Sequence, residues 1–450
     1  MSYRTSPAPL TTMPPGIPYI IGNELAERFS FYGMRTILMI FMTQSLMTHG
    51  GAKDIMSEAE ASTWMHYYMA AVYYTPLIGG LIADLWLGKY RTIISLSMLY
   101  CLGHLILAID HTRTGLFWGL ACVALGAGGI KPCVASHVGD QFGSGNSRLL
   151  PRIYNWFYFS INFGSFFSTL LTPWLMKHYG PHVAFGVPGI LMFIATVMFW
   201  MGRNSFAHIP PQPKMFMEEL LRPAVLRSLA GLVMIFLFIA MFWSLFDQTA
   251  SRWVAQATRM DLHMFGIEVL PDQIQAVNPL LVLVMIPLFS LVIYPWTNRV
   301  YQLTPLRKIC IGFAVAAVSF VIPALVESWI AAGEKPSIWW QVLAYVLITG
   351  AEIMISITSL EFSYTQAPAR LKSFIMALYY FGVGLGNTFT SLVNKSIEKA
   401  GIASSLTGAG YYWFFVKCMA VTTVIFVFVA MFYKGRTYLQ DDKDVVSPGA

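Results

Sequence analysis

The most obvious shortage in this 450-residue sequence is of charge, because only 11% of its residues are Asp, Glu, Lys or Arg. A soluble globular domain carries about 25% charged residues. Hydrophobic residues make up 56% of the chain and aromatic residues 15%. Apolar stretches of about 20 residues, long enough to cross a bilayer, recur along nearly the whole chain. The composition therefore predicts an integral membrane protein that leaves little chain for a soluble domain.

Cysteine and enzyme motifs are also scarce. The five cysteines lie inside predicted spans without regular spacing, so no disulfide framework is expected. The sequence contains no HExxH or GxSxG motif and no cluster of His and Cys with metal-ligand spacing. We also find no ring of residues that would form the selectivity filter of a channel. The sequence thus predicts neither an enzyme nor a channel, and it predicts no metal or other cofactor.

The apolar stretches divide into about twelve helices, which predicts an all-α membrane fold. A polar connection with Pro210, Pro211 and Pro213 separates the first six from the last six. The predicted parts are an N-terminal tail (1–16), a six-helix bundle (17–203), a linker (204–223), a second six-helix bundle (224–433) and a C-terminal tail (434–450). Residues 1–15 are polar and contain prolines, so no cleavable signal peptide is predicted.

The net charge of +7 is explained by topology rather than by nucleic-acid binding. Most Lys and Arg residues lie in the two tails and in the connections that follow the even-numbered spans. Positive charge accumulates on the cytoplasmic side of membrane proteins. Both termini are therefore predicted to be cytoplasmic.

The first helix carries an unusual set of charges within an apolar span. Glu24, Glu27, Arg28, Tyr32 and Arg35 fall at relative positions 0, 3, 4, 8 and 11, which is one stripe of an α-helix. A charge in the middle of a bilayer costs about 2.5–3.5 kcal/mol, so these groups must face partners or a wet cavity. A structural ion pair between Glu24 and Arg28 is the alternative. One such ion pair requires only one of the two carboxylates, so the second favours a role in binding and releasing protons.

This segment resembles the proton-dependent oligopeptide transporter family of the major facilitator superfamily, whose first helix carries the motif ExxERFxYYG. The matching residues are Glu24, Glu27, Arg28, Phe29, Tyr32 and Gly33, while Phe31 replaces the first tyrosine of the pair. A second family motif, FYxxINxGS, is matched by Phe157, Tyr158, Ile161, Asn162, Gly164 and Ser165. The segment EFSYTQAP, residues 361–368, resembles the family's ending of helix ten.

The resemblance implies a major facilitator fold and a symporter that imports di- and tripeptides with protons by alternating access. Glu24, Glu27 and Arg28 would then form the proton switch. A dipeptide is a zwitterion, so its site needs a cationic pole and an anionic pole. Arg35 and Lys131 are expected to bind the carboxylate, and Lys131 is also expected to contribute to proton coupling.

Lys131 follows the small residues Gly126, Ala127, Gly128 and Gly129, which permit close helix packing. The alternative is a lysine that snorkels toward the cytoplasmic face. In the family, the matching lysine faces the central cavity near the carboxylates of the first helix.

Two glutamates on the tenth predicted span compete for the role of anionic pole. Glu352 and Glu361 are nine residues apart, so an unbroken helix cannot direct both to one cavity. Glu352 lies deeper in the span and shares a face with Ser356 and Ser359. Its position also matches the family glutamate that meets the peptide amine. We therefore expect Glu352 and Ser356 to bind the peptide, and a structural pairing near Arg370 or Lys372 is a suitable role for Glu361.

Amide and aromatic side chains are expected to complete the peptide site. Asn162 and Asn278 can both donate and accept hydrogen bonds to the central amide groups. Aromatic walls give broad side-chain specificity, and this role is expected for Tyr32, Tyr73, Tyr158 and Trp243. Tyr379 stands where relatives have a tryptophan.

Two further residues are candidates for proton coupling. His66 titrates near neutral pH, and the matching histidine of animal family members is tied to coupling. A packing role is the alternative for His66. Asp247 is expected to shape an outer gate or to stage an incoming proton, and an ion pair with Arg252 explains Asp247 equally well. Arg252 itself is assigned to gating.

A second gating element is expected after the second span. The segment with Asp84, Lys89 and Arg91 resembles the major facilitator loop signature, in which a carboxylate and nearby cations latch neighbouring helices. A purely topological role for the two basic residues is the alternative.

The main rival function is a proton-coupled carrier of another small anion, such as nitrate or an organic acid, on the same fold. Glu352 argues against it, because an anion site needs no carboxylate opposite its cations. The short connection from Val326 to Ser337 leaves no room for the large extracellular domain of animal members, which suggests the inner membrane of a bacterium. The expected partners are short peptides, protons and the lipid bilayer, and a monomer is expected to suffice.

Overall fold

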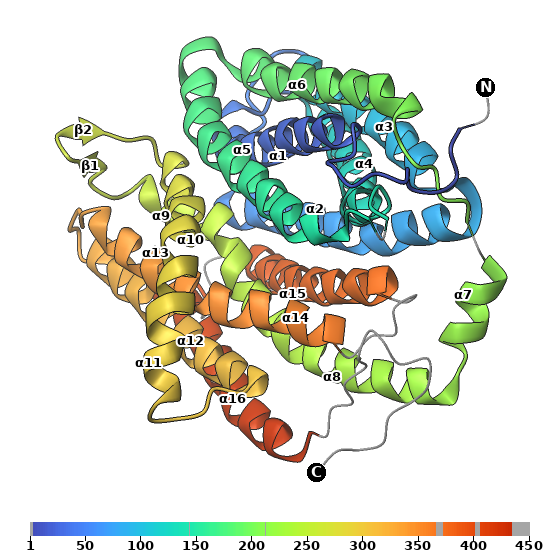
Figure 1. Cartoon of the computed structure of the whole chain (residues 1–450). Helices are drawn as coiled ribbons and strands as arrows, with labels where there is room; N and C mark the ends of the chain where they lie inside the picture. The colour runs from blue at the N-terminus through green and yellow to red at the C-terminus, as the bar shows by residue number, and fades with distance from the viewer. Residues whose placement is uncertain (1–2, 144, 212, 366–371, 401–405, 434–450) are drawn as a thin grey trace. The chain divides into compact units, whose positions relative to one another are not determined.

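The computed structural model describes residues 3–143, 145–211, 213–365, 372–400 and 406–433 (Figure 1). These residues form twelve long helical segments, which confirms the predicted all-α membrane fold. Nine helices in this part of the chain are long and apolar enough by composition to cross a membrane. The first helix is not among the nine, since its charged stripe breaks the apolar composition.

The chain divides into two compact units. Residues 1–57 and 68–217 form the first unit, and residues 58–67 and 218–450 form the second. The second helix is thus shared, because its first ten residues make their contacts with the second unit. The predicted division at the linker, which rests on the number of helices, places residues 58–67 with the first six helices instead.

The first unit contains six long helices. Within it, α1 packs along α5 and α6, and α3 packs along α4 and α6. The elements are α1 (Ile17–Ile40), η1 (Phe41–Ser45), α2 (Glu58–Ile82), η2 (Ala83–Leu87), α3 (Lys89–Ile109), α4 (Arg113–Gly139), η3 (Ser147–Leu149), α5 (Leu150–Tyr179), α6 (Pro181–Met201) and η4 (Gly202–Asn204).

Small residues set the distance between α2 and α4. A Cβ atom added to Gly79 would lie 2.4 Å from the Cα atom of Gly129. The hydroxyl of Thr75 donates a hydrogen bond to the carbonyl oxygen of Ala124 across the same interface, at 2.8 Å. The glycines before Lys131 therefore serve close packing, as the sequence predicts.

The second unit contains the helices from α8 to α16 and a short hairpin. Within it, α8 packs along α15, and α12 packs along α13 and α16. The elements are α8 (Pro223–Phe246), η5 (Asp247–Ala250), α9 (Arg252–Ala257), β1 (His263–Met264), β2 (Ile267–Glu268), η6 (Gln273–Ala276), α10 (Val277–Leu288), η7 (Phe289–Ile293), α11 (Tyr294–Asn298), α12 (Pro305–Ala331), α13 (Trp339–Glu352), η8 (Ile353–Ile357), α14 (Thr358–Thr365), α15 (Lys372–Ala400) and α16 (Ala409–Phe432).

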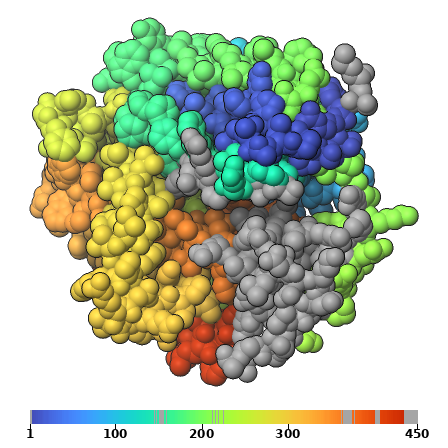
Figure 2. Space-filling view, viewed as in Figure 1, coloured from blue at the N-terminus to red at the C-terminus, as the bar shows by residue number. Residues whose placement is uncertain are grey.

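The segment α10 to α11, yellow in Figure 2, forms part of the surface and carries large apolar side chains. Leu291 is 76% exposed and Trp296 is 68% exposed. A soluble protein does not leave such side chains in water over a whole helix, whereas lipid tails accommodate them. This segment therefore presents its apolar side chains to the membrane.

Two features of the local structure go beyond the sequence analysis. The predicted polar linker contains a helix, α7 (Pro213–Leu220), whose proline occupies the first helical position, where a missing N–H costs nothing. The tenth span is not an unbroken helix, because the π-helical turn η8 begins directly after Glu352. A π turn has more residues per turn than an α-helix, so it changes the direction of every side chain beyond it.

Asp272 is a buried carboxylic acid just outside the span that begins at Gln273. Burial raises its pKa from 3.8 to about 7, although backbone N–H groups of Asp272 and Gln273 act in the opposite direction. The unfolded chain releases this proton near pH 4 and the folded chain near pH 7. Stability contributed by the neutral acid is therefore lost as the pH rises between these values.

We expect the substitution Asp272→Asn to stabilise the protein selectively at high pH. Asparagine remains neutral and is also a good residue before a helix. The melting temperature in detergent should rise by at least about 2 °C near pH 8 and change little near pH 4. An equal change at both pH values would contradict this assignment.

Candidate functional site

The charged stripe of α1 lies inside the first unit. Glu24, Glu27, Arg28 and Arg35 are each at most 8% exposed. The Arg28 Nε donates a hydrogen bond to Glu24 Oε1 at 2.6 Å and lies 3.0 Å from Glu27 Oε2. One guanidinium thus contacts two carboxylates. The pair of Glu24 and Arg28 is present, and the negative charge of Glu27 exceeds what the single positive charge of Arg28 can balance.

Close packing holds α1 against α5 and α6. A Cβ atom on Gly164 of α5 would lie 2.8 Å from the carbonyl oxygen of Leu25. The hydroxyl of Thr172 on α5 donates to the carbonyl oxygen of Gly33 at 2.9 Å, and the hydroxyl of Ser30 donates to the carbonyl oxygen of Pro188 on α6. These contacts fix the position of α1, and with it the charged stripe, against α5 and α6.

Lys131 of α4 is a second cation of this unit. Its Nζ lies 4.1 Å from the ring centroid of Phe31 and 5.1 Å from that of Tyr73. An ammonium group is attracted to the negative face of an aromatic ring at such distances. Phe31, where the family motif has a tyrosine, therefore contacts a site cation through its ring and needs no hydroxyl to do so.

Three other predicted residues of the first unit lie on α1 and α5. Asn162 is buried on α5, and Tyr32 is partly buried on α1. Tyr158 lies on α5, but its side chain lies outside the described residues. The first unit brings together Glu24, Glu27 and Arg28 in one cluster, and Lys131 and Tyr73 in another.

Glu352 forms an acidic centre in the second unit. The Asn278 Nδ2 of α10 donates to Glu352 Oε2 at 2.8 Å and to the hydroxyl oxygen of Thr349 at 3.0 Å. Both Asn278 and Glu352 are partly exposed. Two residues assigned separately to peptide contact thus touch each other. Glu361 lies on α14, but its side chain lies outside the described residues.

An aromatic pair adjoins the π turn of the tenth span. The Trp243 Nε1 of α8 donates to the hydroxyl oxygen of Tyr379 on α15 at 3.2 Å. The Tyr379 hydroxyl donates to Ser356 Oγ of η8 at 3.3 Å. Both rings are buried. Three predicted peptide contacts, Trp243, Tyr379 and Ser356, therefore form one hydrogen-bonded chain.

His66 lies in a chain of buried polar groups within the second unit. The Asn387 Nδ2 of α15 donates to Asp247 Oδ2 at 2.7 Å. The Asn387 Oδ1 faces His66 Nδ1 at 2.7 Å, so Nδ1 carries a proton and donates it. The His66 Nε2 lies 2.9 Å from Ser251 Oγ. The sequence suggests both His66 and Asp247, but it does not indicate the amide that joins them.

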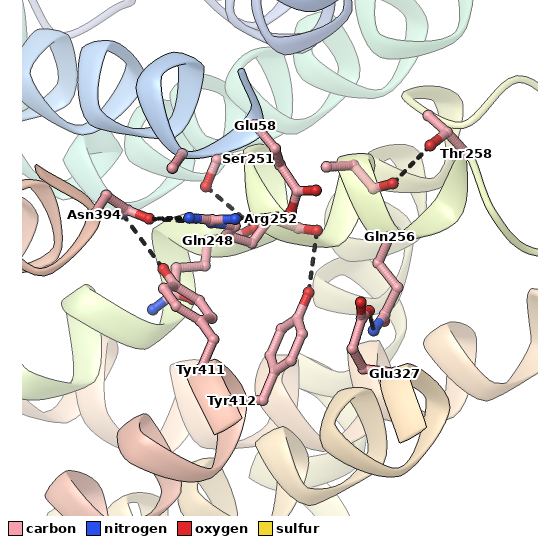
Figure 3. Close-up of polar contacts among 12 residues, drawn as sticks. Glu58, Gln248, Ser251, Arg252, Gln256, Thr258, Glu327, Asn394, Tyr411 and Tyr412 are labelled. Atoms are coloured by element: carbon pink, nitrogen blue, oxygen red, sulfur yellow. Dashed lines mark hydrogen bonds and ion pairs between the residues drawn. The ribbon is translucent and has the colours of Figure 1, made fainter. Parts of the chain in front are cut away.

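Arg252 is the centre of a second polar cluster in this unit (Figure 3). Its Nη1 donates to Glu58 Oε1 at 2.9 Å, and its Nε and Nη2 both donate to Asn394 Oδ1 at 3.0 and 2.6 Å. Its guanidinium carbon lies 4.5 Å from the ring centroid of Tyr411. Arg252 thus pairs with Glu58, whereas Asp247 accepts from Asn387.

The predicted loop latch has a different acidic partner from the one expected. Lys89 donates to both carboxylate oxygens of Asp140, at 2.9 and 2.7 Å. Asp84 is near enough to Lys89 for electrostatic attraction, and Arg91 is exposed. Gly88, with φ of +76°, makes the sharp connection from η2 to α3 that brings Lys89 into this position.

Sequence reasoning missed the polar stripe of α15. Asn387, Thr390, Ser391 and Asn394 are all fully buried and fall at relative positions 0, 3, 4 and 7. This is the same helical periodicity that identifies the stripe of α1. Uncharged polar residues cost less free energy in an apolar span than charged residues do. Their pattern is therefore a weaker indication of a functional site. Glu58 was missed because it lies at the very start of its helix.

Long apolar helices with buried charged clusters define this protein as a polytopic membrane protein. The model of the POT family matches residues 90–226 and 222–414, which is more than half of the chain. The chain therefore belongs to the POT family, which confirms the resemblance found in the sequence motifs.

The chain is similar to Peptide transporter family 1 of Drosophila melanogaster, with 38% identity over 367 residues, 71% of this chain and 48% of the relative. It is 34% identical to solute carrier family 15 member 1 of Homo sapiens over 377 residues, 70% of this chain and 52% of the relative. The chain spans about half the length of these curated relatives.

Two solved structures are similar over almost the whole chain. The crystal structure of an auto-inhibited POT family peptide transporter has a TM-score of 0.88 and 34% identity, and the match covers 95% of this chain and 99% of the other. The structure of the POT family transporter PepTSo has a TM-score of 0.84 and 35% identity, with coverage of 93% and 98%.

Proposed function

We propose that this protein is a proton-coupled symporter that imports di- and tripeptides across the cytoplasmic membrane by alternating access. The observation that carries the proposal is the carboxylate of Glu352, held by Asn278 at 2.8 Å, in a chain that also carries the cations Arg35 and Lys131. A zwitterion requires both poles, whereas a simple anion requires only cations. The names of the peptide-transporting relatives support this assignment.

Each end of the peptide has its own contacts in the proposal. Arg35 and Lys131 bind the carboxylate, and Lys131 is steered by the rings of Phe31 and Tyr73. Glu352 binds the amine, and Asn162 and Asn278 bind the central amide groups. The rings of Tyr32, Tyr73, Tyr158, Trp243 and Tyr379 surround the peptide side chains, and Ser356 supports Tyr379.

Proton coupling is assigned to the cluster of Glu24, Glu27 and Arg28. Protonation of one carboxylate removes its attraction for Arg28, so the guanidinium interacts with its other partner alone. The charge change then favours a different access state. Lys131 lies close enough to Glu27 for electrostatic interaction, which links the proton switch to the peptide carboxylate.

Protons are proposed to enter by way of Asp247 and His66. The amide of Asn387 holds Asp247 and the His66 Nδ1 at 2.7 Å each, so the charge of Asp247 orients the imidazole. An imidazole oriented in this way can accept a proton at Nε2, which lies 2.9 Å from Ser251 Oγ, and release it again. Asn387 is a positioning residue in this route.

Gating is assigned to ion pairs at helix ends. Arg252 and Glu58 form one pair, and Lys89 with Asp140 forms another, next to Asp84 and Arg91. Pairs of this kind stabilise one access state and separate in the other. The proposal includes the inner membrane of a bacterial cell, cytoplasmic termini and a functional monomer without a cofactor.

Dialanine uptake into proteoliposomes tests the proposed function. Uptake should saturate with dialanine concentration and should exceed equilibrium only when a proton gradient, acid outside, is imposed. Unlabelled dipeptide should compete, whereas nitrate should not. Uptake that is indifferent to the gradient, or competition by nitrate alone, would contradict the proposal.

A further inference from the structure

The connection between α9 and α10 carries a hairpin whose two faces differ in polarity (Figure 1). Its strands pair His263 with Glu268 and Met264 with Ile267. Residues that pair directly across two strands point to the same side, and the next pair points to the opposite side. His263 and Glu268 therefore form a polar face, and Met264 and Ile267 form an apolar face. Ile267 is 68% exposed, so the described residues leave the apolar face largely uncovered.

The turn of the hairpin has an unusual residue at its tip. Phe265 and Gly266 both have a positive φ, of 51° and 80°. Positive φ at both positions is the pattern of a type I′ turn, in which Asn-Gly and Asp-Gly are the favoured pairs. A bulky aromatic residue at positive φ is strained. Phe265 is 86% exposed, so packing within the described residues does not compensate for this strain. The residue type at the tip therefore indicates a contact outside the chain.

The tip lies at the depth where a membrane span begins. The ring of Phe265 is edge-on to that of Trp339, with centroids 5.0 Å apart. Trp339 is the first residue of α13 and of the apolar span Trp339–Leu360. Tryptophan is enriched where a span enters the headgroup region of a bilayer. Trp339 and Leu343, one turn farther along, are both exposed. The apolar face of the hairpin thus continues the lipid-facing surface of α13.

Two hydrogen bonds fix the hairpin in this position. The Asp261 N–H donates to the carbonyl oxygen of Pro336, and the Ile338 N–H donates to the carbonyl oxygen of Asp261, at 2.9 Å each. These bonds join the base of the hairpin to the residues that directly precede α13. The hairpin therefore cannot move away from the start of the span without breaking them.

We propose that the hairpin is an interfacial anchor whose partner is the lipid bilayer. The side chains of Met264, Phe265 and Ile267 enter the boundary between lipid headgroups and acyl chains. The polar face of the hairpin points to water. A hairpin of two short strands has little stability by itself, and burial of its apolar face in lipid stabilises it. The anchor holds the connection between α9 and α10 at the depth of the start of α13, whatever solute the protein carries.

Fluorine NMR of the protein in lipid nanodiscs tests the anchor. Para-trifluoromethylphenylalanine in place of Phe265 keeps the aromatic ring at the tip. Its fluorine relaxation is measured with spin-labelled phosphatidylcholine and, separately, with a gadolinium complex that stays in water. We expect strong relaxation by the lipid probe and weak relaxation by the aqueous probe. Weak relaxation by both probes would show that protein covers the tip, and this result would overturn the proposal.

Glu268 provides the matched control, because it lies on the same hairpin but on its polar face. The same fluorinated residue in place of Glu268 should be relaxed mainly by the aqueous probe. The ratio of lipid to aqueous relaxation should therefore be several-fold larger at Phe265 than at Glu268. Equal ratios at the two positions, or a larger ratio at Glu268, would overturn the anchor.

Phe265→Asn separates the lipid contact of the ring from the folding of the hairpin. Asn-Gly suits a type I′ turn better than Phe-Gly does, so the hairpin should remain. Loss of a Phe side chain from lipid shifts the partition of the tip toward water by about tenfold or more. With the fluorinated residue in place of Ile267, this substitution should lower the lipid-to-aqueous ratio to that of the control at Glu268. An unchanged ratio would contradict the role of Phe265. None of these measurements requires transport, so the result is independent of the proposed function.

Discussion

Replacing Glu27 by glutamine is expected to abolish gradient-driven dipeptide accumulation while leaving counterflow measurable. Glutamine cannot take up a proton, and it cannot form an ion pair with Arg28, which lies 3.0 Å from Glu27. Accumulation should fall to the level found without a gradient, because a proton gradient cannot drive uptake through a switch that binds no proton. Glu24→Gln should have the same effect, since Glu24 is the closer partner of Arg28 at 2.6 Å.

The measurement compares two assays on the same proteoliposomes. Gradient-driven uptake requires the proton switch, whereas counterflow exchanges labelled for unlabelled dipeptide without net proton movement. Glu268→Gln is the control for the loss of one negative charge, because Glu268 is exposed on the hairpin strand β2. Undiminished gradient-driven uptake in both Glu24→Gln and Glu27→Gln would rule out this switch.

Replacing Glu352 by glutamine is expected to weaken dipeptide binding by about tenfold to hundredfold, since a hydrogen bond to a charged group is worth about 1.5–3 kcal/mol. Glutamine has nearly the same shape and can still accept the hydrogen bond from Asn278, which is 2.8 Å long in the native protein. The loss should therefore come from the missing charge rather than from misfolding.

A peptide without its amine charge distinguishes this explanation from others. Wild-type protein should prefer dialanine to N-acetyl-dialanine in competition assays, and Glu352→Gln should lose most of that preference. Glu327→Gln is the matched control, because Glu327 is a buried carboxylate of the same unit that Gln256 and Arg259 already engage. A variant that keeps the full wild-type preference would assign the amine to another residue.

The stripe of α1 could be predicted because its cause is local. Glu24, Glu27 and Arg28 are close in sequence, and helical geometry places them on one face whatever the rest of the chain does. The family motif then indicated the roles of Lys131 and Glu352. The same local argument assumed an unbroken tenth span, whereas η8 changes the helical phase directly after Glu352.

The contacts of His66, Arg252 and Lys89 could not be predicted in the same way. Asn387 lies 321 residues from His66, and Glu58 lies 194 residues from Arg252. Neither pair follows a local periodicity. The sequence suggested Asp247 as a partner for Arg252, and only the packing of α2 and α15 in the second unit provides Glu58 and Asn394 instead.

The sequence by itself determined the membrane class, the twelve helical segments and the charged face of the first helix. These follow from hydrophobic length, from the cost of a charge in lipid and from a period of 3.6 residues, all of which act within one helix. Tertiary structure alone decided that the Lys131 ammonium group lies over the ring of Phe31 and that Asn387 joins Asp247 to His66. Contacts between helices depend on which helix faces pack together, and the residues of the whole unit determine that packing.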